Sequence, residues 1–439
     1  MSARDFFMGK RIAVIGIGPS GAMIPDIKYL VKANALVSVY DLQNEASLSS
    51  HMPALHSLGL ANCLCGSIPG DDLLDMDLII LSHEYPRNSS FLNEAHKRGI
   101  QTEYPETLFL KLAPPVMVVG VMGSCGKTTV LSMLSPLLEA ASIGTKQSSF
   151  SIDPESDGGI LSHLKSLKNG DTVAMRIAES MMPEINALGW SPQVAVFTTI
   201  PPARSYSQSP FEILAHQTYN NYVIGNDQII DAVRASSSAL KAKMLRTKTT
   251  LMPDDWLPKS RAPYERENAA LALQAARLFK VTDEAAKEAF AHWKPLKGRL
   301  EPVKKVKNVE FWNDSASVSP HATIAGLGAI SSAGHDLVLI MGGAESGADY
   351  KELYAAAGRY AHTVVLLPGS GTMRERHALR EIDGLTVLSA PSVEEAVRSA
   401  LDHANKGDKV LFSPAFAAGG MDRSRHERGE RFVRAVRSL

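Results

Sequence analysis

The sequence contains few cysteines, no net charge and no long apolar run, and each absence excludes a class of protein. Three cysteines in 439 residues cannot form a disulfide framework, and Cys63 and Cys65 lack the second pair of ligands that a zinc site needs. Lysine plus arginine (46) balance aspartate plus glutamate (46), so the chain as a whole has no electrostatic reason to coat nucleic acid or an anionic membrane. No apolar run reaches about 18 residues, and no signal-peptide pattern opens the chain. We therefore expect a cytoplasmic, monomeric protein that works on small molecules.

Apolar runs that alternate with helical segments organise the chain. The runs "RIAVIGIG" (11–18) and "DLIILSH" (77–83) are typical of parallel strands covered on both faces. Two prolines in "KLAPP" interrupt the pattern, and a second break follows near "HWKPLKGRLEP". We predict an α/β fold of three domains, each a doubly wound sheet of Rossmann-like or P-loop type. Their expected bounds are 1–112 (N-terminal, Rossmann-like), 113–294 (central, P-loop) and 295–439 (C-terminal, Rossmann-like).

The stretch "VMVVGVMGSCGKTTVLSML" (116–134) carries the most specific motif in the chain. Its candidate binding residues are Gly120, Gly123, Ser124, Cys125, Gly126, Lys127, Thr128 and Thr129. Between a strand and a helix, glycines let backbone N–H groups face phosphate oxygens, Lys127 reaches the β- and γ-phosphates, and the Thr128 hydroxyl can bind Mg²⁺. The structural alternative is a glycine turn that only packs strand on helix. The motif predicts an ATP or GTP site.

A second glycine turn lies near the start of the chain. Gly16, Gly18 and Gly21, with Ser20 between them and Asp41 after the next strand, are similar to a dinucleotide fingerprint in which Asp41 would hold a ribose. A purely structural turn, an NAD site and a site for another nucleotide all remain open from this pattern.

Taken together, the three parts resemble the Mur ligase family, whose members use ATP to add amino acids to the UDP-muramoyl precursor of peptidoglycan. The likeness covers nearly the whole chain and is greatest to the branch that adds D-glutamate. It rests on "GKRIAVIGIGPSG", "GVMGSCGKTT", "NDSASVSPHATIAGL" and "VLFSPAFAAGGMDRSRHERGERFVRAV". The resemblance implies amide synthesis through an acyl phosphate, with ATP and Mg²⁺ as cofactors, a UDP-linked or other carboxylate acceptor at the first glycine turn, and an amino acid as the amine.

The resemblance also assigns residues in the second half of the chain. Asn268 matches an adenine contact, Arg299 a hinge arginine near the nucleotide, and Asp314 the aspartate that holds the ATP ribose. Ser413 falls in the segment that resembles the amino-acid end. The structural alternatives are that Asn268 is an amide on a helix surface, Arg299 a solvated charge in a linker, and Asp314 a turn-forming residue.

Some positions near the phosphate loop depart from the family pattern. Thr199 stands where an asparagine is expected, Arg204 where a histidine is expected, and Thr218 or Gln217 where a lysine becomes carbamylated and helps to hold a second Mg²⁺. Glu179 is the remaining candidate metal carboxylate, with a surface glutamate as the alternative. Arg204 could place a fixed positive charge beside the transferred phosphate.

The amino-acid end departs as well. Ser346, Val318, Ala418 and Gly419 replace the lysine, threonine, serine and aromatic residue that grip the incoming side-chain carboxylate. We expect Gly419 and Gly420 to leave room for a larger or differently placed group, and Arg423 and Arg425 to bind the substrate. The alternative is that the two arginines are only a solvated helix start.

Three functions follow from these patterns. They are a ligase of this family with other substrates, the D-glutamate-adding ligase itself, and a nucleotide-binding relative without catalysis.

Overall fold

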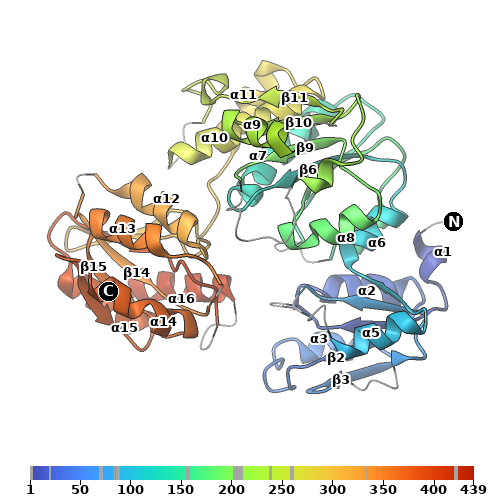
Figure 1. The fold of residues 1–439 in the computed structure, drawn as a ribbon, viewed down its shortest axis with the longest axis horizontal. Helices are drawn as coiled ribbons and strands as arrows, with labels where there is room; N and C mark the ends of the chain where they lie inside the picture. Colours follow the sequence, from blue (N-terminus) through green and yellow to red (C-terminus); the bar gives the residue numbers. More distant parts are fainter. Residues whose placement is uncertain are drawn as a thin grey trace. The chain divides into compact units, whose positions relative to one another are not determined.

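The computed structural model places three sheets along the chain (Figure 1). It describes residues 3–18, 21–68, 73–83, 85, 89–154, 159–200, 211–236, 240–257, 262–332, 334–345, 347–419 and 424–439. The described chain forms two compact units. The first holds residues up to 200, those from 211 to 247, and 271–282, and the second holds those from 248 to 270 and 283–439. The predicted α/β fold class is confirmed, whereas the predicted three-domain boundaries stay a prediction.

The first sheet is wholly parallel, with the order β3-β2-β1-β4-β5. Its strands are β1 (Arg11–Ile15), β2 (Leu36–Asp41), β3 (Asn62–Cys65), β4 (Leu78–Leu81) and β5 (Gln101–Glu103). The accompanying helices are α1 (Ala3–Phe7), α2 (Ile24–Lys32), α3 (Met52–His56), α5 (Ser90–Lys97) and α6 (Pro105–Leu112). Four of the five residues of β1 are buried, as expected for a strand covered on both faces.

The second sheet is also parallel, with the order β11-β10-β9-β6-β8-β7. Its strands are β6 (Met117–Met122), β7 (Ser149–Ile152), β8 (Thr172–Arg176), β9 (Val194–Phe197), β10 (Tyr222–Gly225) and β11 (Lys243–Arg246). Helices of this part of the chain are α7 (Lys127–Ser142), α8 (Met182–Ala187), α9 (Asp227–Ser236), α10 (Pro263–Arg277) and α11 (Asp283–His292). The 3-10 turns are η2 (Leu161–Lys165), η3 (Glu179–Met181), η4 (Glu212–Leu214) and η5 (Thr249–Leu251). Because β6 lies between β8 and β9, the loop that follows β6 opens at the carboxyl edge where strand order reverses, the usual ligand position in such sheets.

The third sheet has the order β12-β13-β17-β14-β15-β16 and one antiparallel edge strand. Its strands are β12 (Glu301–Val306), β13 (Val309–Asn313), β14 (Leu337–Met341), β15 (Ala361–Leu366), β16 (Thr386–Ser389) and β17 (Lys409–Phe412). Its helices are α12 (Pro320–Ile330), α13 (Lys351–Tyr360), α14 (Ser370–Arg380), α15 (Val393–His403) and α16 (Arg425–Arg437). Sequence analysis did not predict β12, a mostly exposed strand that joins β13 through Lys307 and Asn308, both at positive φ.

A buried carboxylate links the first two sheets. Asp26 on α2 accepts a hydrogen bond from the backbone N–H of Leu161 at 2.7 Å, at the start of η2. Burial, and to a lesser extent the charge of Glu106, raise the pKa of Asp26 to about 8, against the backbone N–H groups that lower it. Among the described residues, no helix combines the length and apolar character needed to cross a membrane.

Candidate functional site

The phosphate-loop motif forms a turn between β6 and α7. β6 ends at Met122, α7 begins at Lys127, and Gly126, at φ +85°, is the N-cap of the helix. Gly123 has φ +123°, and a Cβ there would overlap the Thr198 hydroxyl and lie 2.8 Å from the Thr199 backbone nitrogen. The loop therefore requires glycine at this point, and it presents the N-terminus of α7, with its positive dipole end, to an anion.

Two threonines after β9 brace the loop from the neighbouring strand. The Thr198 hydroxyl donates to the Met122 carbonyl at 3.0 Å and to the Cys125 carbonyl. The Thr199 hydroxyl oxygen accepts from the Cys125 N–H at 3.1 Å and lies 3.0 Å from the Ser124 hydroxyl. Thr199, which departs from the family pattern, thus has a defined role in holding the shape of this loop.

The Lys127 side chain is buried and folds back over the loop. Its ammonium donates to the Gly123 carbonyl and, at 3.4 Å, to the Ser124 carbonyl. This position keeps a positive charge inside the turn that the motif assigns to phosphate.

A carboxylate and a guanidinium that sequence analysis missed lie beside Thr128. The Thr128 hydroxyl donates to Asp153 Oδ2 at 2.9 Å, and Arg176 Nη1 lies 3.5 Å from Asp153 Oδ1. The Asp153 and Arg176 side chains are 5% and 9% exposed. A charged residue at the end of the buried strand "TVAMR" was the available signal, because buried arginines need partners.

The oxygen atoms at this edge suit Mg²⁺ bound together with a nucleotide. A hydroxyl and a carboxylate are hard donors, and Mg²⁺ is usually held by one or two carboxylates plus substrate phosphates. Among the residues that the structure describes, no group of three or more His, Cys, Asp or Glu side chains could hold a metal. Glu179 begins η3 just beyond β8 and is partly buried, and its predicted metal role stays a prediction. Arg204 lies outside the described residues.

The second unit brings Asp314 and Ser413 together. The Ser413 hydroxyl donates to Asp314 Oδ2 at 2.8 Å, and the Leu300 N–H donates to Oδ1 at 3.2 Å. Burial raises the pKa of Asp314 to about 6, while hydrogen bonds, including one from Ser317, and the charge of Arg299 act in the opposite direction. These contacts place Arg299, Asp314 and Ser413 near one another.

Asn268 lies on α10 in the part of the helix that belongs to this unit, and it is buried. Its assigned contact with adenine stays a prediction.

Comparison with known proteins finds similarity to the Mur ligases. Residues 298–416 match the family model described as "Mur ligase, glutamate ligase domain". The UDP-N-acetylmuramoylalanine–D-glutamate ligases of Roseiflexus sp. (strain RS-1) and Koribacter versatilis (strain Ellin345) are 27% and 26% identical to the chain, and each alignment covers 98% of it and 99% and 98% of the relative. The chain is similar to the Mur ligases over nearly its whole length. Members of this family are ATP-dependent ligases.

Solved Mur ligases share the fold at lower identity. The UDP-N-acetylmuramate–alanine ligase of Thermotoga maritima is 16% identical with a TM-score of 0.64, covering 98% of this chain and 99% of that one. The MurF ligase of the same organism, solved in complex with ADP, is 17% identical with a TM-score of 0.56, covering 89% and 92%.

The first glycine turn is hydrogen-bonded to the aspartate that is predicted to hold a ribose. Asp41 is buried, and its carboxylate accepts from the Ile17 N–H at 2.9 Å and the Gln43 N–H at 2.8 Å. Gly16, Gly18 and Gly21 all have positive φ, and Ser20 lies outside the described residues. These contacts show that Asp41 shapes the turn, and a substrate role for the turn stays a prediction.

At the predicted amino-acid end, Ala344 lies close to Gly419. A Cβ on Gly419 would lie 2.7 Å from the Cβ of Ala344, so a side chain does not fit at this position without a shift. The expectation that Gly419 leaves room for a different group stays a prediction. Arg425 is the first residue of α16, which Ser424 caps, and its substrate role stays a prediction. Ser346, Gly420 and Arg423 lie outside the described residues.

Arg428 organises this end and was missed by sequence analysis. Its buried guanidinium donates to the carbonyls of Gly342, Phe416 and Ala417 at 3.1, 3.0 and 3.4 Å. It therefore ties the loop after β14 to the loop after β17. The helical spacing of Arg428, Phe432 and Val436, all buried on α16, was the sequence signal.

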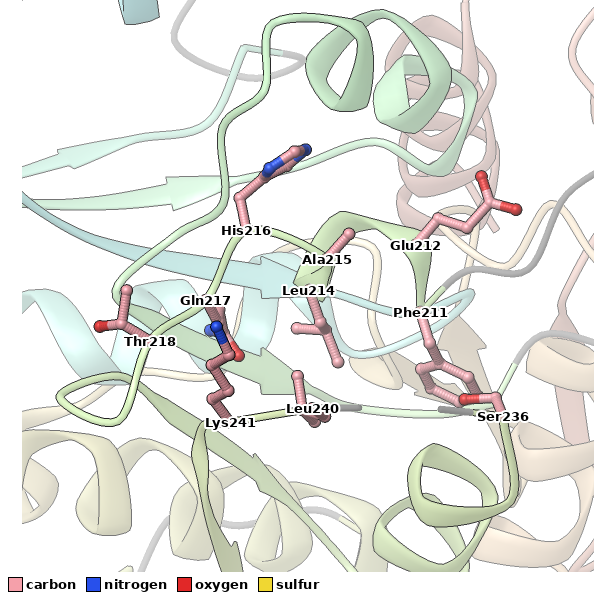
Figure 2. Close-up of a pocket in the computed structure, with 10 residues that line it drawn as sticks. All are labelled: Phe211, Glu212, Leu214, Ala215, His216, Gln217, Thr218, Ser236, Leu240 and Lys241. Atoms are coloured by element: carbon pink, nitrogen blue, oxygen red, sulfur yellow. The ribbon is translucent and has the colours of Figure 1, made fainter. Parts of the chain in front are cut away.

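A pocket of about 480 Å³ lies at the residues that were aligned with the carbamylated lysine of the Mur ligases (Figure 2). Gln217 and Thr218 line it together with Phe211, Leu240 and Lys241. The Gln217 amide donates to the carbonyl of Pro192, which precedes β9, so these residues lie at the amino-terminal edge of the sheet. The structure therefore does not bring Gln217 or Thr218 to the phosphate loop at the carboxyl edge.

Proposed function

We propose that the chain is an ATP-dependent amide ligase that activates a carboxylate as an acyl phosphate and passes the acyl group to an amino acid. The observation that carries the proposal is the loop between β6 and α7, with its glycine at φ +123°, its buried Lys127 and the helix N-terminus behind them. The similarity of the chain to Mur ligases supports the reaction class.

The reaction has two displacements. A carboxylate oxygen of the acceptor attacks the γ-phosphorus of ATP, and the bond to the β-phosphate oxygen breaks to release ADP. The amine nitrogen then attacks the acyl carbon, the bond from that carbon to the phosphate oxygen breaks, and the nitrogen loses a proton as phosphate leaves. Phosphoryl transfer of this kind depends mainly on positioning and charge stabilisation.

The residues of the loop can supply both positioning and charge stabilisation. Lys127 and the backbone N–H groups at the start of α7 would hold the phosphate oxygens and balance the charge that develops on them. Mg²⁺, for which Thr128 offers a hydroxyl, would add further charge neutralisation at the β- and γ-phosphates. The two threonines after β9 would keep the loop in one conformation without taking part in the chemistry.

For the substrates, we propose a UDP-muramoyl-type carboxylate as acceptor, bound by the N-terminal sheet, and an amino acid as amine. The names of the relatives support both. We propose that D-glutamate is not the preferred amine, because Val318, Ala418 and Gly419 offer no charged or hydroxyl group where the family grips a carboxylate. Losing two charge-assisted hydrogen bonds, each worth about 1.5–3 kcal/mol, would weaken D-glutamate binding on the order of a hundredfold or more. A different carboxylate, such as a cofactor precursor, is the alternative acceptor.

Phosphate release tests the proposal. The purified chain is given ATP and Mg²⁺ with UDP-N-acetylmuramoyl-L-alanine and a panel of amino acids, and each component is then omitted in turn. We expect release only when an acceptor and an amine are both present. Lys127→Ala should abolish turnover, whereas Lys146→Ala, which alters an exposed lysine just beyond α7, should not. Full turnover in Lys127→Ala would contradict the assignment.

A nucleotide-binding relative without ligase activity is the second candidate. It is favoured by Gln217 and Thr218, which replace the expected lysine and lie at the opposite edge of the sheet from the loop. This candidate predicts ATP binding by titration calorimetry with no phosphate release for any acceptor and amine.

A further inference from the structure

Three successive strands, β6, β7 and β8, which lie in the order β6-β8-β7 in the sheet, bring Thr128, Asp153 and Arg176 to one edge of the second sheet. Arg176 is the last residue of β8 and pairs in register with Val121 of β6. Asp153 directly follows Ile152, which pairs with Met175 of β8, so Asp153 is next to Arg176 across the sheet. Thr128 enters from the first turn of α7. All three side chains therefore meet at the carboxyl ends of parallel strands, beside the phosphate loop.

The two oxygens of the Asp153 carboxylate face different side chains. One oxygen, Oδ2, accepts from the Thr128 hydroxyl at 2.9 Å. The other, Oδ1, faces the Arg176 guanidinium at 3.5 Å. The hydroxyl that the motif assigns to Mg²⁺ is therefore paired with a carboxylate, and that carboxylate is already next to a fixed positive charge.

The charges set the conditions under which a cation can bind here. Asp153 and Arg176 together carry no net charge, and both are almost fully buried, so their charges are weakly screened. A divalent ion that approached Asp153 alone would gain one carboxylate and be repelled by the guanidinium. An ion that arrives with a nucleotide brings phosphate oxygens as well, and these offset the repulsion.

We infer that Asp153 and Arg176 form a charge-balanced pair at the phosphate loop that makes divalent-cation binding depend on bound nucleotide. In this assignment, which rests on the proposed function, Asp153 is the carboxylate beside the Thr128 hydroxyl on the metal side of the loop. Arg176 is a positioning residue that holds Asp153 and prevents the ion from binding alone.

Binding of Mn²⁺ to the full-length protein, followed by electron paramagnetic resonance, tests the pair with and without ADP. The wild type should bind Mn²⁺ weakly alone and more tightly with ADP. Asp153→Asn should lose about tenfold or more of the Mn²⁺ affinity measured with ADP, the scale typical of losing a metal-site partner, while ADP binding in EDTA stays unchanged. Arg176→Gln should bind Mn²⁺ without ADP about tenfold or more tightly than the wild type, because the carboxylate is no longer balanced.

Two matched variants control for burial and charge. Asp171 is also buried beside β8 and accepts from the Ser148 and Lys168 N–H groups at 2.8 Å each, but it lies at the amino-terminal edge. Arg246 pairs with Asp227 and Asp231 at the far edge strand β11. Asp171→Asn and Arg246→Gln should leave both Mn²⁺ affinities as in the wild type.

Two results would overturn the inference: wild-type Mn²⁺ affinity with ADP in Asp153→Asn, or no gain in Mn²⁺ affinity without ADP in Arg176→Gln. The Arg176→Gln measurement leaves the carboxylate unaltered, so it decides the matter even if Asp153→Asn does not fold. It also needs no nucleotide. If the wild type binds no ADP, the proposed function fails, and the measurement without ADP still tests the pair.

Discussion

Replacing Gly123 with alanine tests whether the geometry of the phosphate loop is required for nucleotide binding. The residue has φ +123°, and an added Cβ would overlap the Thr198 hydroxyl and lie 2.8 Å from the Thr199 backbone nitrogen. A non-glycine residue in so rarely populated a conformation costs about 1–3 kcal/mol. Overpacking against backbone that cannot easily move adds about 1–3 kcal/mol. The sum is about 2–6 kcal/mol.

Gly144 supplies the matched control within the same sheet domain. It follows the other end of α7, has φ +78°, and a Cβ there would meet nothing within 4 Å. Gly144→Ala should therefore cost only the backbone strain, about 1–2 kcal/mol, and leave the phosphate loop intact.

The two variants are compared by thermal unfolding and by ADP titration. If the loop opens locally to relieve the strain, the cost appears as lost ADP affinity, at least about thirtyfold for 2 kcal/mol. If it does not open, the cost appears as a lower melting temperature, roughly 2–4 °C for each kcal/mol in a unit of this size. Gly144→Ala should keep wild-type ADP affinity. Wild-type ADP affinity in Gly123→Ala, together with a melting temperature no lower than that of Gly144→Ala, would refute the reasoning.

Two further predictions concern packing inside each of the two units. Arg428→Met should lower the free energy of unfolding of the second unit by more than about 3 kcal/mol in urea titrations, because two buried carbonyls and one part-buried carbonyl lose a charged donor. Arg431→Met breaks a partly exposed pair with Glu394 and should cost about 0–1 kcal/mol. Equal losses in the two variants would disprove the role of Arg428. Burial raises the pKa of Asp26 from 3.8 to about 8, so the folded protein holds a proton on this carboxyl that the unfolded chain gives up. The stability that this difference contributes is fully present below pH 3.8 and is lost as the pH rises through 8. When the pH is raised from 5 to 8.5, the melting temperature of the wild type should therefore fall more than that of Asp26→Asn. Equal falls in the two proteins would contradict this.

Much of the fold was predictable because its signals are local. The buried parallel strands β1, β6 and β14 appear in the sequence as continuous apolar runs, and the phosphate loop appears as glycines spaced between a strand and a helix. Strands with weaker burial gave no such signal. β12 alternates between exposed and half-buried residues and joins the sheet only through its hairpin with β13.

The candidate site was predictable only in part. Glycine spacing located the loop, since each glycine is required by the backbone conformation of its own turn. The partners of that loop come from elsewhere: Thr198 and Thr199 follow β9, Asp153 follows β7, and Arg176 ends β8. Which strands lie beside β6 depends on the sheet order, and no short stretch of sequence encodes that order.

The sequence by itself determined the kind of structure and the class of chemistry: parallel α/β sheets, a phosphate-binding turn and a likeness to the Mur ligases. Tertiary structure alone decided which side chains share a site. It paired Thr128 with Asp153 and Asp153 with Arg176, brought Ala344 close to Gly419, and placed Gln217 away from the loop. The physical reason is that backbone conformation and burial pattern follow from neighbouring residues, whereas contacts between side chains follow from strand register and order across the sheet.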